Sequence, residues 1–74
     1  MYIIYGKDGC IWCDQAKKFL VDNKEEFEFR NIEVNVSARS EFVIQFPNVR
    51  TVPQIITPDG DKIGGFDALV NLYK

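Results

Sequence analysis

The chain has 74 residues, of which 46% are hydrophobic and 27% charged, a balance typical of a compact globule and not of a disordered tail. A chain this short buries only about 60% of its unfolded surface, which excludes a second domain, so we expect one domain over residues 1–74. The formal net charge of -2 gives no electrostatic reason for binding to nucleic acid or to an anionic membrane.

The first segment, residues 1–5, is rich in β-forming residues without polar alternation, which predicts a strand buried on both faces. A helix is predicted over residues 13–21, with Cys10 at or near its N-cap and Asn23 as a candidate for the left-handed position at its end. One face of this helix is predicted to carry the residues that fall at helical spacing, which are Trp12, Ala16, Phe19 and Leu20.

A second strand is predicted over residues 27–32, where apolar and polar residues alternate. It should run parallel to the first strand if the intervening helix is a crossover. Ser37 is the predicted N-cap of a second helix, which Pro47 would stop. That helix should bury Phe42, Phe46 and one of Val43 and Ile44.

A third strand is predicted over residues 52–57, and the turn Pro58-Asp59-Gly60 would join it to residues 61–64 as an antiparallel hairpin. Apolar residues at helical spacing predict a last helix over residues 66–73. The predicted order is β-α-β-α-β-β-α, which gives an α/β fold with one mixed sheet covered by helices.

Cys10 and Cys13 are the only cysteines of the chain. No apolar run approaches the roughly 18 residues that span a bilayer, and residues 1–7 lack the pattern of a secretory signal, so we expect a cytoplasmic protein. A reducing cytosol keeps structural disulfides open, which favours a catalytic or metal-binding role for the pair. Because the chain has no histidine, Cys-His catalysis and Cys₂His₂ zinc binding are excluded.

Two thiols three residues apart at the start of a helix suit a dithiol oxidoreductase. Cys10 would attack because it lies at the exposed end of the helix, and Cys13, one turn inside, would resolve the mixed disulfide. The helix N-terminus, N–H donors near Cys13 and the charge of Lys7 would lower the pKa of Cys10, whereas Asp8 and Asp14 would oppose this. Helix charge contributes about 0.3–1 kcal/mol, less than the ~1.36 kcal/mol of one pKa unit, so hydrogen bonds to sulfur must contribute more.

Three other interpretations remain open from the residues alone. Both cysteines can be small core residues, or they can bind a metal or an iron-sulfur cluster. Trp12 is either a core residue on the helix face or an apolar platform beside the thiol. A non-catalytic protein would use the surface around Trp12 only for binding.

Four blocks in chain order carry a resemblance to a known family, and together they cover essentially the whole chain. They are Lys7 with Cys10-Ile11-Trp12-Cys13, then Thr51-Val52-Pro53, then Pro58-Asp59-Gly60, then Gly64-Gly65-Phe66-Asp67. With these blocks the chain resembles the glutaredoxins, most closely the short bacteriophage glutaredoxins also called phage thioredoxins. The resemblance implies a thioredoxin fold, with a four-stranded mixed sheet and three helices.

The resemblance also implies a set of binding residues. The peptide bond between Val52 and Pro53 would be cis and lie beside the cysteines, and the backbone of Val52 would pair with a substrate peptide or with glutathione. Lys7 would meet a carboxylate of glutathione, and the start of the last helix would receive its γ-glutamyl end. The full set of implied substrate or glutathione contacts is Lys7, Trp12, Thr51, Val52, Pro53, Gly65, Phe66 and Asp67.

The chain departs from the family pattern at three positions. Ile11 and Trp12 replace the proline and tyrosine of the glutaredoxin CPYC motif, and Ala68 stands where many glutaredoxins carry an acid. These changes leave the redox potential and the strength of glutathione binding open.

The function implied by the resemblance is transfer of electrons from glutathione or thioredoxin reductase to protein disulfides, with ribonucleotide reductase as the expected acceptor. Glutathione would act as a co-substrate, with no tightly bound cofactor and no metal site. We expect a monomer in the cytoplasm, or in the host cytoplasm if a phage encodes it. The alternative is a glutathione-dependent module in which Cys10 of two chains binds a [2Fe-2S] cluster.

Overall fold

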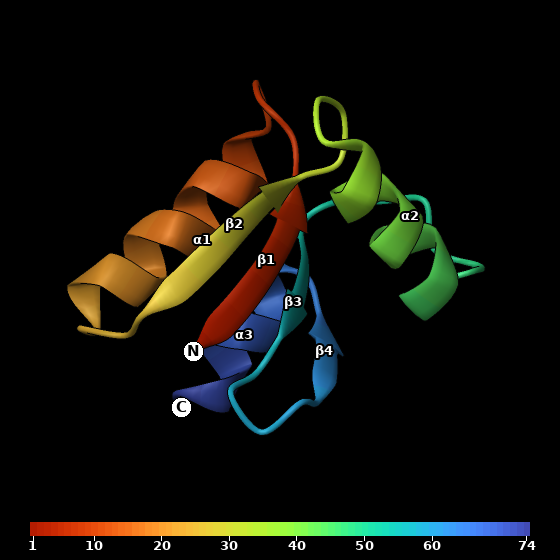
Figure 1. The fold of residues 1–74 in the computed structure, drawn as a ribbon. Helices are drawn as coiled ribbons and strands as arrows, with labels where there is room; N and C mark the ends of the chain where they lie inside the picture. The colour runs from red at the N-terminus through yellow and green to blue at the C-terminus, as the bar shows by residue number, and fades with distance from the viewer.

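The computed structural model describes residues 1–74, and its elements follow the predicted order β-α-β-α-β-β-α. The elements are β1 (Tyr2–Gly6), α1 (Ile11–Asp22), β2 (Phe27–Asn31), α2 (Val36–Gln45), β3 (Gln54–Ile56), β4 (Lys62–Gly64) and α3 (Phe66–Leu72). The strands form one sheet in the order β2-β1-β3-β4 (Figure 1). None of the helices is long and apolar enough to cross a membrane.

Strand β1 lies inside the sheet and is hydrogen-bonded on both edges. It pairs in parallel with β2 and antiparallel with β3, and β3 pairs antiparallel with β4. The predicted parallel crossover unit and the predicted hairpin are therefore both confirmed. In the turn of the hairpin Gly60 adopts a φ of +92°, a conformation that glycine tolerates because it has no Cβ.

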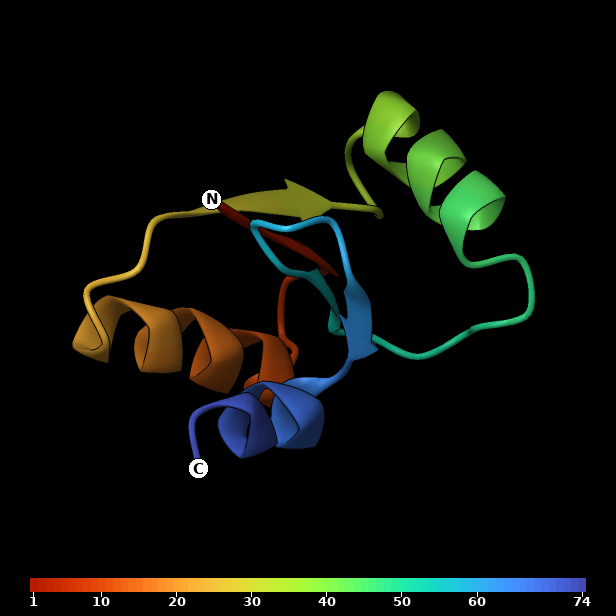
Figure 2. The ribbon, with the colours of Figure 1, turned by 90° about the horizontal axis from the view of Figure 1, so that it is seen from below.

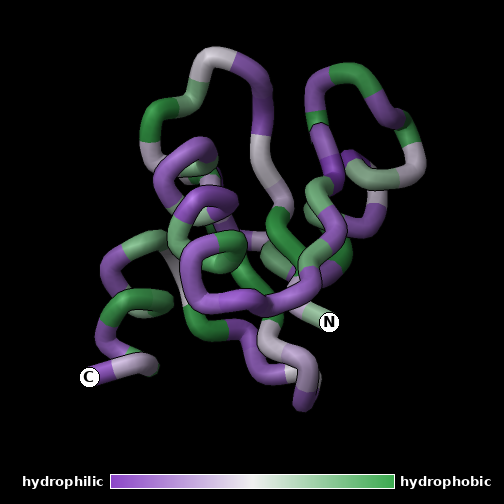
Figure 3. Tube along the Cα trace, turned by 90° about the vertical axis from the view of Figure 1, so that its left-hand side faces the viewer, coloured by the Kyte–Doolittle hydropathy of each residue, from purple (hydrophilic) through white to green (hydrophobic).

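The helices cover both faces of the sheet. Helices α1 and α3 lie side by side on one face and α2 lies on the other (Figure 2). Alternate side chains of β1 therefore enter two separate cores, and hydrophobic segments run through the centre of the molecule (Figure 3). The first core contains Tyr2, Ile4, Ala16, Leu20, Ile55 and Leu69, and the second contains Tyr5, Phe42, Phe46 and Ile56.

Helix α1 begins earlier than predicted, at Ile11, and Cys10 is its N-cap as predicted. The predicted left-handed position is wrong by one residue, because Asn23 is the C-cap with a φ of -94° and Lys24 adopts the left-handed φ of +58°. Both the backbone N–H and the side-chain amide of Asn23 donate to the carbonyl of Phe19. These two bonds keep Asn23 attached to the last turn, so the chain reverses at the next residue.

Helix α2 differs from the prediction in its cap and in its buried face. Its N-cap is Asn35 and not Ser37, because the Asn35 side chain accepts the N–H of Ala38 at 3.0 Å. Phe42 and Phe46 are buried as predicted, but Val43 and Ile44 are 58% and 77% exposed. The buried positions are four residues apart, so the residues between them point away from the sheet.

Tyr5 fixes α2 to the second face of the sheet through a hydrogen-bonded network. Its hydroxyl donates to Glu41 at 3.1 Å and accepts from Arg30 at 3.1 Å and from Gln45 at 3.0 Å. Arg30 also donates to Glu41 at 2.6 Å. Burial raises the pKa of Tyr5 above its usual value. The network thus ties β1, β2 and α2 together and keeps the phenol neutral.

The two ends of the chain lie at the same end of the molecule, opposite the loop that precedes α1 (Figure 1). The hydroxyl groups of Tyr2 and Tyr73 are 2.9 Å apart, and the Tyr73 hydroxyl donates to Glu25 at 2.8 Å. These contacts attach the end of the chain to the start of β1 and to the loop after α1.

Candidate active site

Cys10 and Cys13 form a disulfide at the start of α1, with their Cα atoms 5.2 Å apart. The N–H of Cys13 donates to Cys10 Sγ at 3.1 Å, so one of the open N–H groups of the helix start is directed at this sulfur. Cys13 is completely buried and Cys10 is 8% exposed. Cys10 is therefore the outer of the two sulfurs, which is the order predicted from their places in the helix.

Cys10 is less exposed than a residue at a free helix end, because the segment before β3 lies against it. The carbonyl oxygen of Val52 is 3.9 Å from Cys10 Sγ. The peptide bond between Val52 and Pro53 is cis, which confirms the expectation drawn from the family resemblance. This segment brings the backbone carbonyl of Val52 next to the outer sulfur.

Gly6, the last residue of β1, makes room for the inner sulfur. A Cβ atom at this position would lie 2.8 Å from Cys13 Sγ and 2.7 Å from Cε1 of Phe29, closer than side-chain atoms pack. Gly6 has no positive φ, so the need for glycine is steric. Nothing in the local sequence around Gly6 reveals this contact with Cys13.

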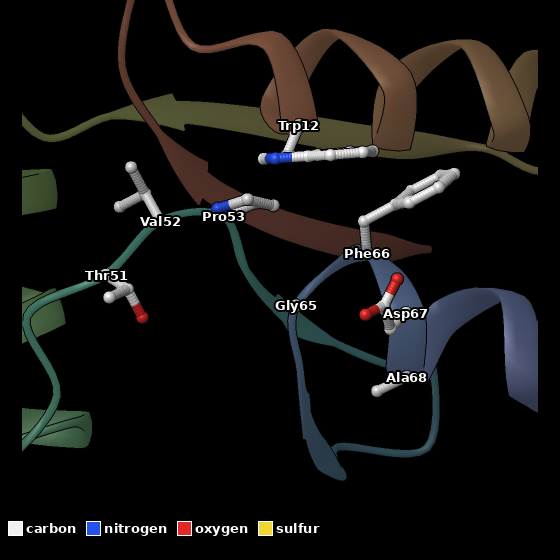
Figure 4. Close-up of a pocket in the computed structure, with 8 residues that line it drawn as sticks. All are labelled: Trp12, Thr51, Val52, Pro53, Gly65, Phe66, Asp67 and Ala68. Atoms are coloured by element: carbon white, nitrogen blue, oxygen red, sulfur yellow. The ribbon is translucent and has the colours of Figure 1, made fainter.

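A groove of about 490 Å³, here called the Trp12 groove, is shown in Figure 4. It adjoins the disulfide through Val52, whose carbonyl oxygen is 3.9 Å from Cys10 Sγ. Trp12 of α1 lies on one side, the start of α3 on another and the segment before β3 on the third. The groove contains every binding residue implied by the resemblance except Lys7. Its lining is Trp12, Thr51, Val52, Pro53, Gly65, Phe66, Asp67 and Ala68.

Trp12 is 57% exposed, so it is a surface platform and not a core residue of the helix face. Its ring stacks on Phe66 with the centroids 5.7 Å apart and an interplanar angle of 26°. Phe66 in turn packs edge-on against Phe19 with centroids 6.1 Å apart. The aromatic wall of the groove is therefore supported from the side of the first core.

Lys7 lies in a second groove and does not reach the Trp12 groove. The loop after β1 places it beside residues of α2 and of the segment that follows α2. Val52 lines both grooves, so the two adjoin at the residue whose carbonyl is next to Cys10. Ala68 contributes a methyl group to the Trp12 groove, at the position where many glutaredoxins would carry an acid.

A disulfide at the start of the first helix of a βαβ unit, with a proline segment from the third strand beside it, defines a thioredoxin-fold protein with a thiol-disulfide site. The glutaredoxin family model matches residues 2–63. A glutaredoxin of Enterobacteria phage T4 is 36% identical over 87 residues, with both chains covered completely. The chain therefore belongs to the glutaredoxin family and is a thiol-disulfide oxidoreductase with a redox-active cysteine pair.

Solved structures agree with this fold. Glutaredoxin 1 from Francisella tularensis, complexed with cacodylate, has a TM-score of 0.76 and 30% identity, with 97% of this chain and 90% of that chain covered. A glutaredoxin-glutathione complex from buckwheat has a TM-score of 0.81 and 22% identity, with 97% and 66% covered. The fold expectation, a four-stranded mixed sheet with three helices, is thus confirmed.

Proposed function

We propose that this protein passes electrons from glutathione or thioredoxin reductase to disulfides of protein substrates, and that Cys10 is the attacking residue. The observation that carries the proposal is the position of Cys10 Sγ. This sulfur is the outer one of the pair, accepts the N–H of Cys13 at 3.1 Å and adjoins both grooves through Val52.

The exchange proceeds in two steps that together deliver two electrons. The thiolate of Cys10 attacks one sulfur of the substrate disulfide, so that a mixed disulfide forms and the other substrate sulfur leaves as a thiolate. The thiolate of Cys13 then attacks Cys10 Sγ, which releases the second substrate thiolate and leaves the Cys10–Cys13 disulfide seen in the structure. Two glutathione thiols, or thioredoxin reductase, return the pair to the dithiol and complete the cycle.

The hydrogen bond from Cys13 supports Cys10 as the attacking group. An N–H that donates to sulfur stabilises a thiolate more than a thiol, and the positive end of the α1 dipole acts in the same direction. Cys13 lacks exposure to solvent, so a substrate disulfide cannot reach it directly, but it is already in bonding contact with Cys10. These properties suit an intramolecular resolving thiol.

The Trp12 groove supports the proposal that glutathione is a co-substrate. The groove offers an aromatic platform, the backbone of Val52 and the carboxylate of Asp67. The carbonyl of Val52 lies next to Cys10. In our proposal the cysteine of glutathione lies along Val52, and its γ-glutamyl end meets Gly65, Phe66 and Asp67. Its other carboxylate would point across Val52 toward Lys7 in the second groove.

The acceptor and the compartment are proposed from the resemblance to the glutaredoxins. We propose ribonucleotide reductase as an acceptor and the cytoplasm as the site of action, the host cytoplasm if a phage encodes the protein. A reducing compartment supplies the glutathione that regenerates the dithiol. We also propose that the protein acts as a monomer, because both cysteines and the Trp12 groove belong to one chain.

The test compares Cys10→Ser with Cys13→Ser. Each reduced variant is mixed with a disulfide-containing protein, and mixed disulfides are detected by mass spectrometry. We expect Cys13→Ser to accumulate a mixed disulfide through Cys10 and Cys10→Ser to form none. Turnover by Cys10→Ser at the rate of the unmodified protein would overturn the proposal.

The electron donor and the acceptor are tested separately with the unmodified protein. NADPH consumption is followed with glutathione plus glutathione reductase in one reaction and with thioredoxin reductase in the other. Reduction by either system supports the corresponding donor, and failure of both overturns this part of the proposal. A lack of electron transfer to ribonucleotide reductase would remove that acceptor without affecting the exchange chemistry.

A further inference from the structure

The second groove is larger than the Trp12 groove and has a different charge. It encloses about 760 Å³, compared with about 490 Å³, and lies between the loop after β1, helix α2 and the segment before β3. Its cations are Lys7, Arg39 and Arg50, and its apolar residues include Phe42, Val43 and Val49. We call it the basic groove.

The three cations of the basic groove have no acidic partner. The only cations that form salt bridges in the protein are Lys17 and Arg30, and neither lines the groove. The single acidic residue that lines the groove is Glu33. The chain as a whole has a net charge of -2, whereas the residues that line this groove carry a net positive charge. A groove of this kind attracts a negatively charged partner and disfavours a basic one.

The basic groove also continues onto exposed apolar surface. Arg39 and Val43 line both this groove and a hollow of about 360 Å³ on the outer side of α2. The other residues of the hollow are Val36, Ser40 and Ile44. Val36 is 82% exposed, and Ile44 is 77% exposed. Apolar surface next to unpaired cations fits a polypeptide segment that carries both acidic and apolar residues, and it exceeds what a single carboxylate of a tripeptide needs.

We propose that the basic groove binds an acidic segment adjacent to the disulfide of the protein substrate. This inference depends on the proposed function and deepens it by defining the substrate class. Val52 joins the basic groove to the Trp12 groove, and its carbonyl lies 3.9 Å from Cys10 Sγ. A chain whose disulfide reaches Cys10 therefore passes directly into the basic groove, where carboxylates meet Arg39 and Arg50.

The experiment uses two peptides of equal length, each with an internal disulfide flanked on one side by Glu-Leu-Glu or by Lys-Leu-Lys. Reduced protein reacts with each peptide and, in a third reaction, with 2-hydroxyethyl disulfide, which is small and neutral. We expect the second-order rate constant of this reaction to be at least tenfold higher for the acidic peptide at low ionic strength. The difference should shrink as salt is added, because exposed charges are screened.

The double variant Arg39→Glu with Arg50→Glu should abolish this preference. Lys18→Glu with Lys74→Glu is the matched control, because it changes the net charge equally at exposed positions outside both grooves. We expect the control to keep the preference and both variants to react normally with the neutral disulfide.

Two results would overturn the inference while leaving the proposed function intact. The unmodified protein could react equally with both peptides, or the groove variant could lose activity equally on all three disulfides. Failure of the unmodified protein to react with any disulfide would instead overturn the proposed function, and the inference with it.

Discussion

At the scale of single residues, the site depends on one position that carries no functional group. Gly6 leaves space for the sulfur of Cys13 and for the ring of Phe29, which lie where its side chain would be. The same residue also accepts the N–H of Ile32 through its carbonyl, so the backbone at this point is fixed on the β2 side. Because the backbone cannot withdraw, an added methyl group must displace the sulfur or the ring.

We therefore predict that Gly6→Ala lowers the free energy of unfolding by about 1–3 kcal/mol, the range for an overpacked core. It should also change the equilibrium potential of the Cys10–Cys13 pair, because the inner sulfur moves. Urea denaturation and equilibration in glutathione redox buffers measure the two effects.

Gly65→Ala is the control for this prediction, because its Cβ would meet only the carbonyl of Pro53 at an ordinary 3.6 Å. Because Gly65 is the N-cap of α3, where glycine is preferred over alanine, the effect of this substitution on stability should be a loss of at most about 1 kcal/mol, and the potential of the cysteine pair should not change. Equal stability and equal potential for Gly6→Ala and the unmodified protein would show that the space next to Cys13 is not restrictive.

The cysteine pair could be predicted from the sequence, whereas Gly6 could not. The N-cap position of Cys10 follows from local rules, since a glycine turn comes before an amphipathic segment. The requirement at Gly6 comes from Phe29 and Cys13, which reach it only after the sheet and α1 have packed. Lys7 illustrates the same limit, because its place in the basic groove depends on the position of α2.

At the scale of elements, α2 is the helix whose orientation the sequence predicted least well. Three apolar residues in succession, Phe42, Val43 and Ile44, allow several choices of buried face. In the structure the buried residues are Phe42 and Phe46, which are four positions apart and pack in one core with Tyr5 and Ile56 of the sheet. The strands were predicted more reliably because the hydrophobic runs and the turn at Pro58-Asp59-Gly60 constrain them locally.

This orientation leads to a contrast between neighbouring substitutions in α2. We predict that Phe42→Ala lowers the free energy of unfolding by about 3–5 kcal/mol, because the ring is 7% exposed and packs against Tyr5. Ile44→Ala, at a residue that is 77% exposed, should change it by less than about 0.5 kcal/mol. Urea denaturation followed by circular dichroism measures both, and a larger loss for Ile44→Ala would contradict the observed face.

At the scale of the whole molecule, the order of the strands interleaves the two halves of the chain. Strand β1 lies between β2 and β3, and the α1 and α3 helices from opposite ends of the sequence share one core. We propose that residues 1–74 unfold as one cooperative unit, as expected for one domain. Coincident transitions by Trp12 fluorescence and far-ultraviolet circular dichroism would support this, and separate transitions would contradict it.

We predict that the protein loses stability in alkaline solution because of two tyrosines, Tyr5 near the start of the chain and Tyr73 near its end. Burial raises the pKa of Tyr5, and burial with hydrogen bonds to Tyr2 and Glu25 raises the pKa of Tyr73. As the pH rises past about 10, the phenols of the unfolded chain lose their protons first, which favours unfolding. The contribution of these groups is therefore complete below about pH 10 and is lost above it.

The measurement is the free energy of unfolding of the oxidised protein in urea between pH 8 and pH 11. We expect a decline that begins near pH 10 and is shallower in Tyr5→Phe, which has one phenol fewer to titrate. Identical slopes for the variant and the unmodified protein would exclude a contribution from Tyr5.

The common position of the two chain ends has a practical consequence for handling the protein. Both ends lie away from the loop that leads to Cys10, on the side where Tyr2 meets Tyr73 (Figure 1). An affinity tag, a fluorophore or a linker to an electrode at either end would therefore leave the approach to Cys10 unobstructed. The protein can be tethered by one end and still present its disulfide to large partners.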